Sequence, residues 1–538
     1  MQPAKEQSLI FKPKMGADRR LRELGANELV FAVVGPVGSG TSWVASSLAG
    51  VLKNPTYGMD VHIIKASDVI SSYVQRTIGV PLDTSSTYTK VTALQDAGDS
   101  MREGDPAAVA VELITAIKST RSAQHKADEI VKSIAPADKA TRRAYIIDSL
   151  KHPAEVELLR AIYQESFCLI GVVCQEKIRE DRLLSKKCQS TGLTGIQALM
   201  LRDEDDADRK HGQKVTDTFH LADFFVDNSP ARYTDEEREI PNPLWEVNDQ
   251  LARLVDLLTV GKVLRPTASE FGMFHAYGAK MRSACLSRQV GAALLDKKGN
   301  LLSTGTNEVP RAGGGVYGGG FDDDDDQGLT TDDRCVATNK FCSSNRSQET
   351  IIKEIIETIP VLNAVPDKIA LAKQLKKTPI WRLLEFSRAV HAEMDALLSA
   401  ARTGSTTVGT RLFVTTFPCH YCARHVVSAG VDEVQFIEPY PKSRALKLHG
   451  DAITTVVADW VPPSGKGSGA GITRKVLFRP FTGVAPRLYR RVFMKDRSLK
   501  DEAGNFSIGE TTWARGLLRL SYQDVENTVL ADRREGND

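Results

Sequence analysis

The clearest motif of the C-terminal half is the stretch from His391-Ala392-Glu393 to Pro418-Cys419-His420-Tyr421-Cys422. One imidazole and two thiolates are three ligands for a tetrahedral zinc ion, and they leave a fourth position for water. Glu393 lies two positions after the histidine, where a carboxylate can move protons without binding the metal. The stretch therefore predicts Zn²⁺ bound by His391, Cys419 and Cys422, with Glu393 as the catalytic residue.

The two motifs together are the signature of zinc-dependent base deaminases, which attack C4 of cytosine or C6 of adenine. Alone, a His-x-Glu carries no information, and a Cys-x-x-Cys also fits a structural zinc half-site or a redox pair. Here Pro418 precedes the first cysteine, and the apolar stretch 411–416 before it predicts a strand. This combination predicts a catalytic zinc site rather than a structural or decayed one.

Length and composition predict a cytoplasmic protein of two or three domains. A chain of 538 residues is too long for a single hydrophobic core. Its 41% hydrophobic and 26% charged residues are typical of soluble globular proteins, and no membrane span or signal peptide is recognisable. The eight cysteines show no disulfide-framework spacing. A net charge of +2 gives no global electrostatic argument for nucleic-acid binding.

A second motif follows the apolar strand pattern of residues 29–34. The segment from Gly35 to Ser42 has the spacing of a phosphate-binding loop that leads into a helix. Its candidate nucleotide contacts are Gly35, Gly38, Ser39, Gly40, Thr41 and Ser42. Thr41 replaces the lysine that contacts the β- and γ-phosphates, so efficient phosphoryl transfer is doubtful. Backbone binding of ATP or another nucleotide stays open, and so does a plain tight turn.

Asp148 ends a second apolar strand, at the position where phosphate-loop folds hold Mg²⁺ together with the loop serine. A basic stretch further on fits either the phosphate-clamping lid of a nucleotide kinase or a solvated helix face; it contains Lys177, Arg179, Arg182, Lys186 and Lys187. Residues 25–230 therefore resemble a P-loop nucleotide-kinase domain, an α/β fold with a doubly wound parallel sheet. A linker and a connecting helix are expected over residues 231–265.

The region after residue 266 resembles deoxycytidylate deaminases. It contains, in their order, Ser-x-x-x-Ser-Arg-x-Val-Gly-Ala (283–292), Gly-x-Asn (305–307), His-Ala-Glu and Pro-Cys-x-x-Cys-Ala. The resemblance implies a cytidine-deaminase-like α/β/α domain over 266–495, with substrate contacts from Asn307, Arg288 and the Ala392 backbone. A turn asparagine and a structural salt bridge are the alternatives for Asn307 and Arg288.

Residues 313–386 depart from compact deoxycytidylate deaminases. The segment is rich in glycine at its start and contains the acidic run Asp322–Asp326, which predicts a solvated loop and leaves a metal site as the weaker alternative. Helices are expected over 349–375. This insertion is a candidate for substrate gating or subunit contact.

Three further stretches, 307–310, 438–443 and 478–487, extend the resemblance to two-domain bacterial antiphage dCTP deaminases. In that group a P-loop domain without the loop lysine precedes the deaminase. The resemblance implies deamination of free dCTP, and of dCMP, as antiviral defence. It also implies a homo-oligomer and, in part of the group, a small inhibitory RNA or a phage-derived trigger. Residues 496–538 are expected to form a polar tail.

Other functions stay open on sequence alone. A polynucleotide editor acting on tRNA or single-stranded DNA needs a basic groove with stacking aromatic residues, which the near-neutral charge and 7% aromatic content support poorly. A nucleotide-binding switch that uses the deaminase fold only for assembly would not need Glu393. A working nucleotide kinase fused to a deaminase is disfavoured by Thr41.

Overall fold

The computed structural model describes residues 28–83, 85–132, 142–185, 192–204, 212–259, 262–318, 332–382, 386–440, 443–457, 460–465, 474–495 and 498–507. The chain divides into two compact units, Met1–Leu264 with Arg490–Asp538, and Arg265–Tyr489. The acidic run Asp322–Asp326 and the lysines Lys186 and Lys187 lie outside the described residues. None of the described helices is long and apolar enough to cross a lipid bilayer.

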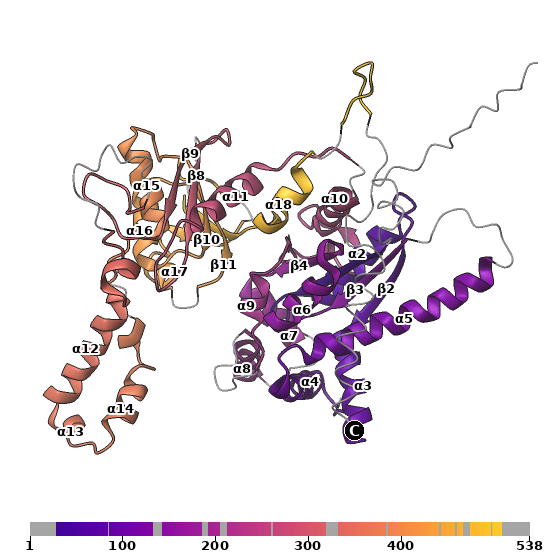
Figure 1. Cartoon of the computed structure of the whole chain (residues 1–538), viewed down its shortest axis with the longest axis horizontal. Helices are drawn as coiled ribbons and strands as arrows, with labels where there is room; N and C mark the ends of the chain where they lie inside the picture. The colour runs from indigo at the N-terminus through magenta and orange to yellow at the C-terminus, as the bar shows by residue number, and fades with distance from the viewer. Residues whose placement is uncertain are drawn as a thin grey trace, which may run out of the picture. The chain divides into compact units, whose positions relative to one another are not determined.

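The N-terminal unit is built on a parallel sheet in which the strands lie in the order β5-β4-β1-β3-β2 (Figure 1). The strands are β1 (Glu28–Val34), β2 (Asp60–Lys65), β3 (Arg143–Asp148), β4 (Phe167–Val173) and β5 (Phe224–Asp227). Every residue of β1, β3 and β4 is buried. Continuous apolar strands of this kind are expected where helices cover both faces of a parallel sheet.

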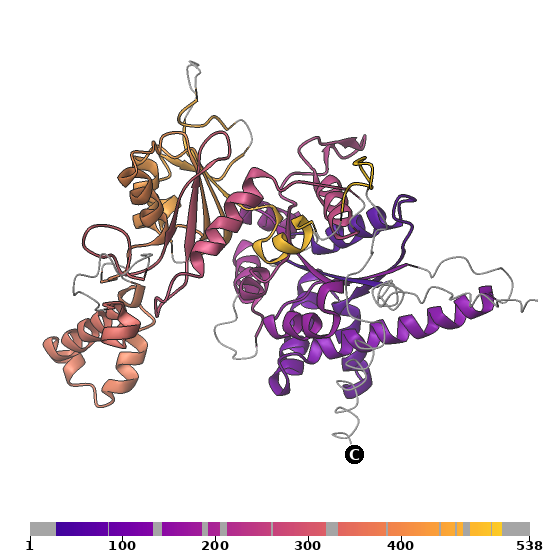
Figure 2. The ribbon, with the colours of Figure 1, turned by 45° about the horizontal axis from the view of Figure 1, so that its top comes forward.

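The helices of this unit are α2 (Thr41–Lys53), α3 (Ala66–Ile78), α4 (Thr87–Gly104), α5 (Ala108–Lys132), α6 (Pro153–Tyr163), α7 (Glu176–Ser185), α8 (Gly192–Glu204), α9 (Val215–Phe219) and α10 (Val247–Thr259), with a 3₁₀ turn at Gln164–Ser166. Helices α2 and α10 lie on one face of the sheet, and α5 and α6 on the other (Figure 2). The sheet is therefore doubly wound, with both faces covered.

Helix α10 differs from the connecting helix that the sequence predicts. Leu251 and Leu254 are fully buried, and the helix packs against α2 and β5 of the same unit. The helical apolar spacing that predicts α10 is the face that packs in this core. A two-stranded hairpin, β6 (Tyr233–Asp235) with β7 (Ile240–Pro241), occupies part of the predicted linker.

The C-terminal unit contains a mixed sheet with the order β12-β13-β11-β10-β8-β9. Its strands are β8 (Gly291–Leu295), β9 (Leu301–Thr306), β10 (Arg411–Thr416), β11 (Glu433–Glu438), β12 (Ile453–Thr454) and β13 (Val476–Pro480). The predicted hairpin of β8 and β9 is antiparallel, and β10 pairs with β8 antiparallel and with β11 parallel.

Helices cover both faces of this sheet. α15 (Ala392–Arg402) and α16 (His420–Ser428) share a core with Ala292, Leu294 and Leu412, which point to one face. On the opposite face α11 (Ala268–Lys280) packs so closely that a Cβ at Gly272 would lie 2.4 Å from the Phe413 ring. The short α17 (Ala445–Leu448), β14 (Gly483–Val484) and α18 (Pro486–Phe493) come later in the chain. The arrangement is the expected α/β/α sandwich.

Strand β9 and helix α15 touch backbone to backbone at Gly305. A Cβ at this position would lie 2.1 Å from the Ala392 carbonyl oxygen and 2.3 Å from the Ala396 nitrogen. Backbone atoms cannot move aside as a flexible side chain can, so glycine is required. This contact fixes the distance between the sheet and the first turn of α15.

The described part of the insertion contains α12 (Ser343–Thr358), α13 (Pro360–Asn363) and α14 (Lys368–Leu375), together with a π-helical turn at Cys335–Asn339 and a 3₁₀ turn at Pro379–Arg382. Ile352 and Ile356 of α12 are buried, and α12 packs against α13 and α14. The helices expected over 349–375 therefore form a small hairpin of their own.

Candidate active site

The histidine and the two cysteines of the motif stretch converge at the starts of two helices. His391 is the N-cap residue of α15, Cys419 is the N-cap residue of α16, and Cys422 lies in the first turn of α16. His391 Nδ1 lies 3.4 Å from Cys419 Sγ and 3.3 Å from Cys422 Sγ. All three ligand atoms lie within 4.8 Å of one another. One imidazole and two thiols on a common point fit a zinc ion.

The electrostatics around these groups favour a thiolate. Hydrogen bonds from Cys422 and His391 lower the pKa of the Cys419 thiol to about 4. The N-terminus of α16 adds a partial positive charge at the same place. A thiolate is the form that binds metal, so the helix start prepares the ligand.

Glu393 lies on the first turn of α15 and lines a cavity at the ligand group. Its side chain is 4% exposed. Burial, reinforced by the neighbouring Cys419, raises the pKa of Glu393 to about 7. A carboxyl group with a pKa near the working pH can both accept and donate a proton, as a general acid–base catalyst must.

The cavity has a volume of about 140 Å³. Its wall comes from the loop before β8, the segment after β9, residues 387–391, the end of β10 and Tyr440. Asn307 donates from Nδ2 to the Arg288 carbonyl at 2.8 Å. Its Oδ1 is buried and has no hydrogen-bond partner among the described residues, so it is available to a ligand donor.

The other two predicted substrate contacts differ from each other. Arg288 lines the cavity, with its guanidinium 5.4 Å from the centre of the Tyr440 ring. Ala392 is fully buried, and its carbonyl oxygen lies against Gly305. The cavity wall includes His391 and Glu393, on either side of Ala392. The contact predicted for the Ala392 backbone therefore stays a prediction.

The insertion supplies wall residues that the sequence does not single out. Cys335 and the segment 342–344 line the cavity, and so does Arg388 just after the insertion. Only the length of the insertion beside the motif signals their proximity, because no ligand spacing or periodicity identifies them.

The glycine loop of the N-terminal unit joins β1 to α2 and borders a second cavity, of about 680 Å³. Gly38 and Gly40 have φ angles of +83° and +85°, which glycine adopts without strain. Gly38, Gly40, Thr41, Ser42 and Asp148 line this cavity. The loop thus places the first turn of α2 and the Asp148 carboxylate on the wall of one cavity.

The remaining predicted loop residues are held inside the protein. Ser39 is fully buried, and its carbonyl accepts a hydrogen bond from Asn228 Nδ2 at 2.8 Å. A Cβ on Gly35 would lie 2.5 Å from Ser39 Oγ, so the loop is tightly packed. Of the basic stretch, Arg179 donates to Glu204 at 2.8 Å, and Arg182 donates to the Asn228 carbonyl at 2.8 Å.

Residues 267–438 match the family described as the cytidine and deoxycytidylate deaminase zinc-binding region. The deoxycytidylate deaminase of Enterobacteria phage T2 is 29% identical over 170 residues, which are 31% of this chain and 79% of the phage protein. That of phage T4 is 29% identical over 172 residues, 31% of this chain and 77% of its own length. The apo dCMP deaminase of cyanophage S-TIM5 aligns with 18% identity and a TM-score of 0.21, covering 40% of this chain and all (100%) of that one.

The C-terminal unit therefore contains a hydrolytic deaminase domain of the zinc-binding type. More narrowly, its sequence relatives are deoxycytidylate deaminases, and the family's zinc-binding region contains the His391, Cys419 and Cys422 group. This family match begins at residue 267, so it does not include the nucleotide-loop region of the N-terminal unit.

Proposed function

We propose that the protein deaminates free deoxycytidine nucleotides, dCTP and dCMP, to the corresponding deoxyuridine nucleotides. One observation carries the proposal: the buried Glu393 carboxyl lies on a cavity wall beside three convergent zinc ligands. The relation of this region to deoxycytidylate deaminases indicates the class of substrate.

In this proposal, metal binding, proton transfer and substrate positioning are performed by different residues of the chain. A zinc ion held by His391, Cys419 and Cys422 would lower the pKa of a water molecule in the cavity. Glu393 takes a proton from that water and delivers it to N3 of the cytosine ring. The water oxygen bonds to C4, and Glu393 then takes the second proton from that oxygen and passes it to the amino group. The amino group leaves C4 as ammonia while the C4 carbonyl forms. Asn307 and Arg288 hold the nucleotide with its base toward Glu393.

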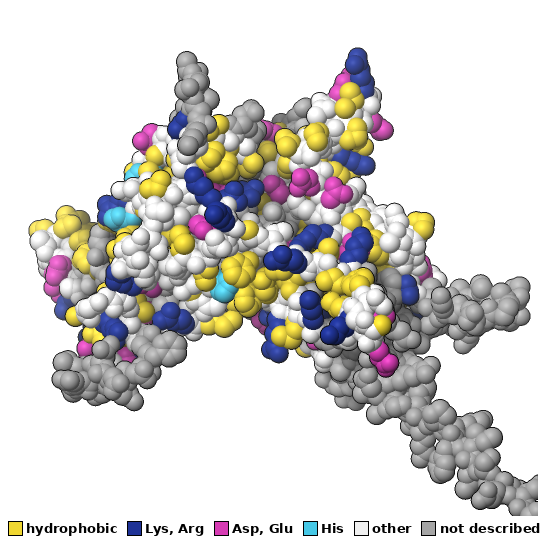
Figure 3. All heavy atoms as spheres, turned by 90° about the horizontal axis from the view of Figure 1, so that it is seen from above, with side chains coloured by type: hydrophobic (Ala, Val, Ile, Leu, Met, Phe, Trp, Pro, Cys, Tyr) yellow, Lys and Arg dark blue, Asp and Glu magenta, His cyan; other side chains and the backbone are white. Residues whose placement is uncertain are grey.

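Charge distribution favours a free nucleotide over a polynucleotide. A polynucleotide editor needs a continuous basic groove with stacking aromatic residues. On the face seen in Figure 3, basic, acidic and hydrophobic side chains of the described residues lie interspersed. The whole chain has a net charge of only +2.

We infer a separate role for the N-terminal unit, the binding of ATP or another nucleotide with Mg²⁺ near Asp148. The carboxylate oxygen Oδ1 of Asp148 is buried at the cavity and lacks a hydrogen-bond partner in the described structure. Thr41 in place of lysine favours regulation over phosphoryl transfer. The sequence resemblance to antiphage dCTP deaminases supports defence by dCTP depletion, homo-oligomerisation, and control by an inhibitory RNA or a phage-derived trigger.

The test is a chromatographic assay of the full-length protein with dCTP, dCMP, CTP, deoxycytidine and a single-stranded oligodeoxynucleotide. We expect conversion of dCTP or dCMP, which Glu393→Gln lowers by at least about 100-fold while one zinc per chain is retained. Cys419→Ser should lose both zinc and activity. Deamination of the oligonucleotide alone would overturn the proposal.

A further inference from the structure

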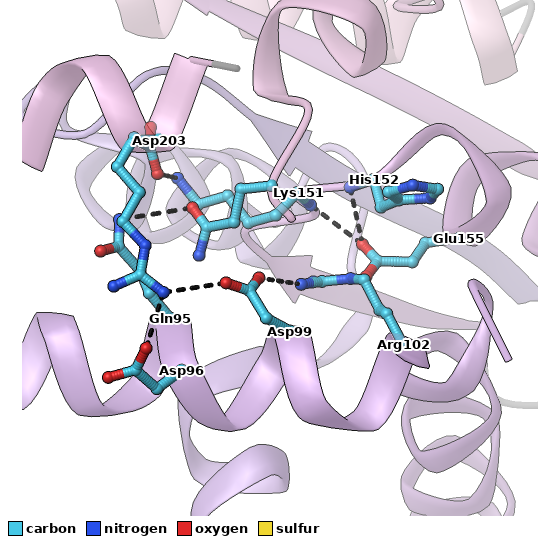
Figure 4. Close-up of polar contacts among 10 residues, drawn as sticks. Gln95, Asp96, Asp99, Arg102, Lys151, His152, Glu155 and Asp203 are labelled. Atoms are coloured by element: carbon cyan, nitrogen blue, oxygen red, sulfur yellow. Dashed lines mark hydrogen bonds and ion pairs between the residues drawn. The ribbon is translucent and has the colours of Figure 1, made fainter. Parts of the chain in front are cut away.

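Lys151 and Asp203 contact each other (Figure 4) and also the glycine loop of the N-terminal unit. Lys151 Nζ donates to Asp203 Oδ1 at 2.8 Å and to the Gly35 carbonyl at 3.3 Å. Asp203 Oδ2 accepts the backbone N–H of Val37 at 2.7 Å. Both side chains line the same cavity as Thr41 and Asp148.

Val37 belongs to the loop whose backbone N–H groups would bind phosphate oxygens. In this structure a carboxylate oxygen accepts one of these donors instead. The Asp203 side chain is buried, and the Lys151 ammonium compensates its charge. The loop is therefore already occupied by an oxyanion of the protein itself.

A network of ion pairs fixes the ends of the elements that carry these two residues. Arg202, next to Asp203 on α8, donates to Asp96 at 2.8 Å and to Asp99 at 2.9 Å on α4. Arg202 thus holds the end of α8 independently of Asp203. The contacts of Arg202 with α4 do not involve the Asp203 side chain.

The lysine side of the pair is held in the same way. Arg102 donates to Asp99 at 3.5 Å and to Glu155 at 2.7 Å. Glu155 in turn accepts the backbone N–H of Lys151 at 2.9 Å (Figure 4). The backbone of Lys151, three positions after Asp148 in the sequence, is therefore fixed. Its ammonium group faces the loop.

The cavity has room and unused polar atoms for a ligand. Its volume is about 680 Å³. Asp148 and Gln95 line it, and in the part of the chain that is described Asp148 Oδ1 and Gln95 Oε1 are buried without a hydrogen-bond partner. Arg232 lies 5.0 Å from the centre of the Trp43 ring at the same cavity. A ligand with an anionic end at the loop and a cation or donor at Asp148 fits these groups.

We propose that Lys151 supplies the phosphate-binding charge that Thr41 cannot, and that Asp203 is a resident carboxylate which an incoming diphosphate or triphosphate displaces. The phosphate takes the Val37 N–H and the Lys151 ammonium from Asp203. This inference rests on the nucleotide-binding role proposed for the N-terminal unit. It makes binding weaker than at an open loop, because the ligand competes with an internal anion.

The experiment is calorimetric titration of the full-length protein with inorganic pyrophosphate and with ATP, each with Mg²⁺. We expect Asp203→Asn to tighten pyrophosphate binding by about tenfold, since no charged hydrogen bond must be broken. Lys151→Met should weaken it by about tenfold or more, and Lys151→Arg should restore part of the affinity. Lys353→Met and Glu357→Gln alter an exposed ion pair of 3.8 Å on α12, outside the N-terminal unit, and should leave the pyrophosphate affinity unchanged.

The outcomes separate the two proposals. Binding by the wild type that neither Asp203→Asn nor Lys151→Met changes overturns this inference alone. Weaker binding by Asp203→Asn at unchanged melting temperature also overturns it. If a single variant melts early, Lys151→Met/Asp203→Asn, which leaves no unpaired charge, should bind pyrophosphate more weakly than the wild type. Absence of pyrophosphate and ATP binding in both the wild type and Asp203→Asn overturns the nucleotide-binding role as well.

Discussion

Asn307 lines the candidate active-site cavity and donates from its amide nitrogen to the Arg288 carbonyl, while its amide oxygen is buried without a partner among the described residues. We expect Asn307→Ala to raise the KM for dCMP about tenfold and to lower kcat less, because a lost ligand hydrogen bond is worth about 1.4 kcal/mol. Steady-state kinetics measure both constants. Asn300→Ala, at the exposed turn between β8 and β9, is the matched control and should keep the wild-type KM. A pure kcat defect would contradict a binding role.

His152 links the stability of the N-terminal unit to pH. Its Nδ1 caps α6 by accepting the Ala154 N–H at 3.2 Å, which requires a neutral ring. Burial lowers the pKa of His152 below its ordinary value, an effect that Glu155 opposes and Arg102 supports. The unfolded chain therefore binds the proton first as pH falls. The stability that this group contributes is present above about pH 6.5 and is lost below it.

The corresponding variant is His152→Asn, because asparagine caps a helix without titrating. Denaturant titrations between pH 7.5 and 5.5 should show a loss of stability for the wild type that is smaller in the variant, by up to about 1 kcal/mol. Equal pH dependence in the two proteins would exclude His152 as the source.

At the scale of single residues, the sequence predicts the convergence of His391, Cys419 and Cys422, but it does not predict the Lys151–Asp203 pair. Metal ligands are restricted to a few residue types at fixed spacings, so His391, Cys419 and Cys422 can be recognised from the sequence. Lys151 and Asp203 lie 52 positions apart, and only the path of α8 brings them together. The role that we propose for Lys151 depends on that tertiary contact.

At the scale of secondary-structure elements, the contact between β9 and α15 predicts the effect of a substitution at Gly305. Gly305→Ala places a methyl group against backbone atoms of α15, so we expect a loss of about 1–3 kcal/mol of stability. Because α15 begins beside His391, zinc occupancy and kcat should fall as well. Melting curves and metal analysis measure these effects.

The control for this substitution is Gly278→Ala. Gly278 lies within α11, and a Cβ there would have no neighbour within 4 Å. Alanine should be neutral or stabilising by up to about 1 kcal/mol, since it favours a helix. Wild-type zinc content in Gly305→Ala would show that α15 can shift without disturbing the ligands.

Elements with a strong apolar periodicity form where the sequence predicts them, whereas the sequence does not predict which elements they pack against. The β8–β9 hairpin, β10 and α10 form where apolar spacing predicts them. The packing of α10 on its own unit is not visible in that spacing, because the same stripe of leucines would suit a connector. The sequence also does not reveal which residues of the insertion line the cavity, since their position depends on the tertiary fold.

At the scale of the whole molecule, two compact units with separate cores should unfold separately. Among the described residues, the group of candidate zinc ligands lies in the C-terminal unit, so a chelator should lower one calorimetric transition and leave the other unchanged. ATP with Mg²⁺ should raise the second transition. Cys419→Ser should show the lowered transition without chelator, and a single transition that moves as a whole would contradict independent units.

The backbone contact at Gly305 also bears on how this enzyme could be redesigned. Two main chains in contact leave no side chain whose size could be changed to move α15, which carries Glu393, relative to β9. Selection for a new nucleobase or sugar would therefore act on the walls, in residues 285–290 and 387–389 and in the insertion at 342–344. A library confined to those loops would vary substrate range while the reacting groups keep their positions.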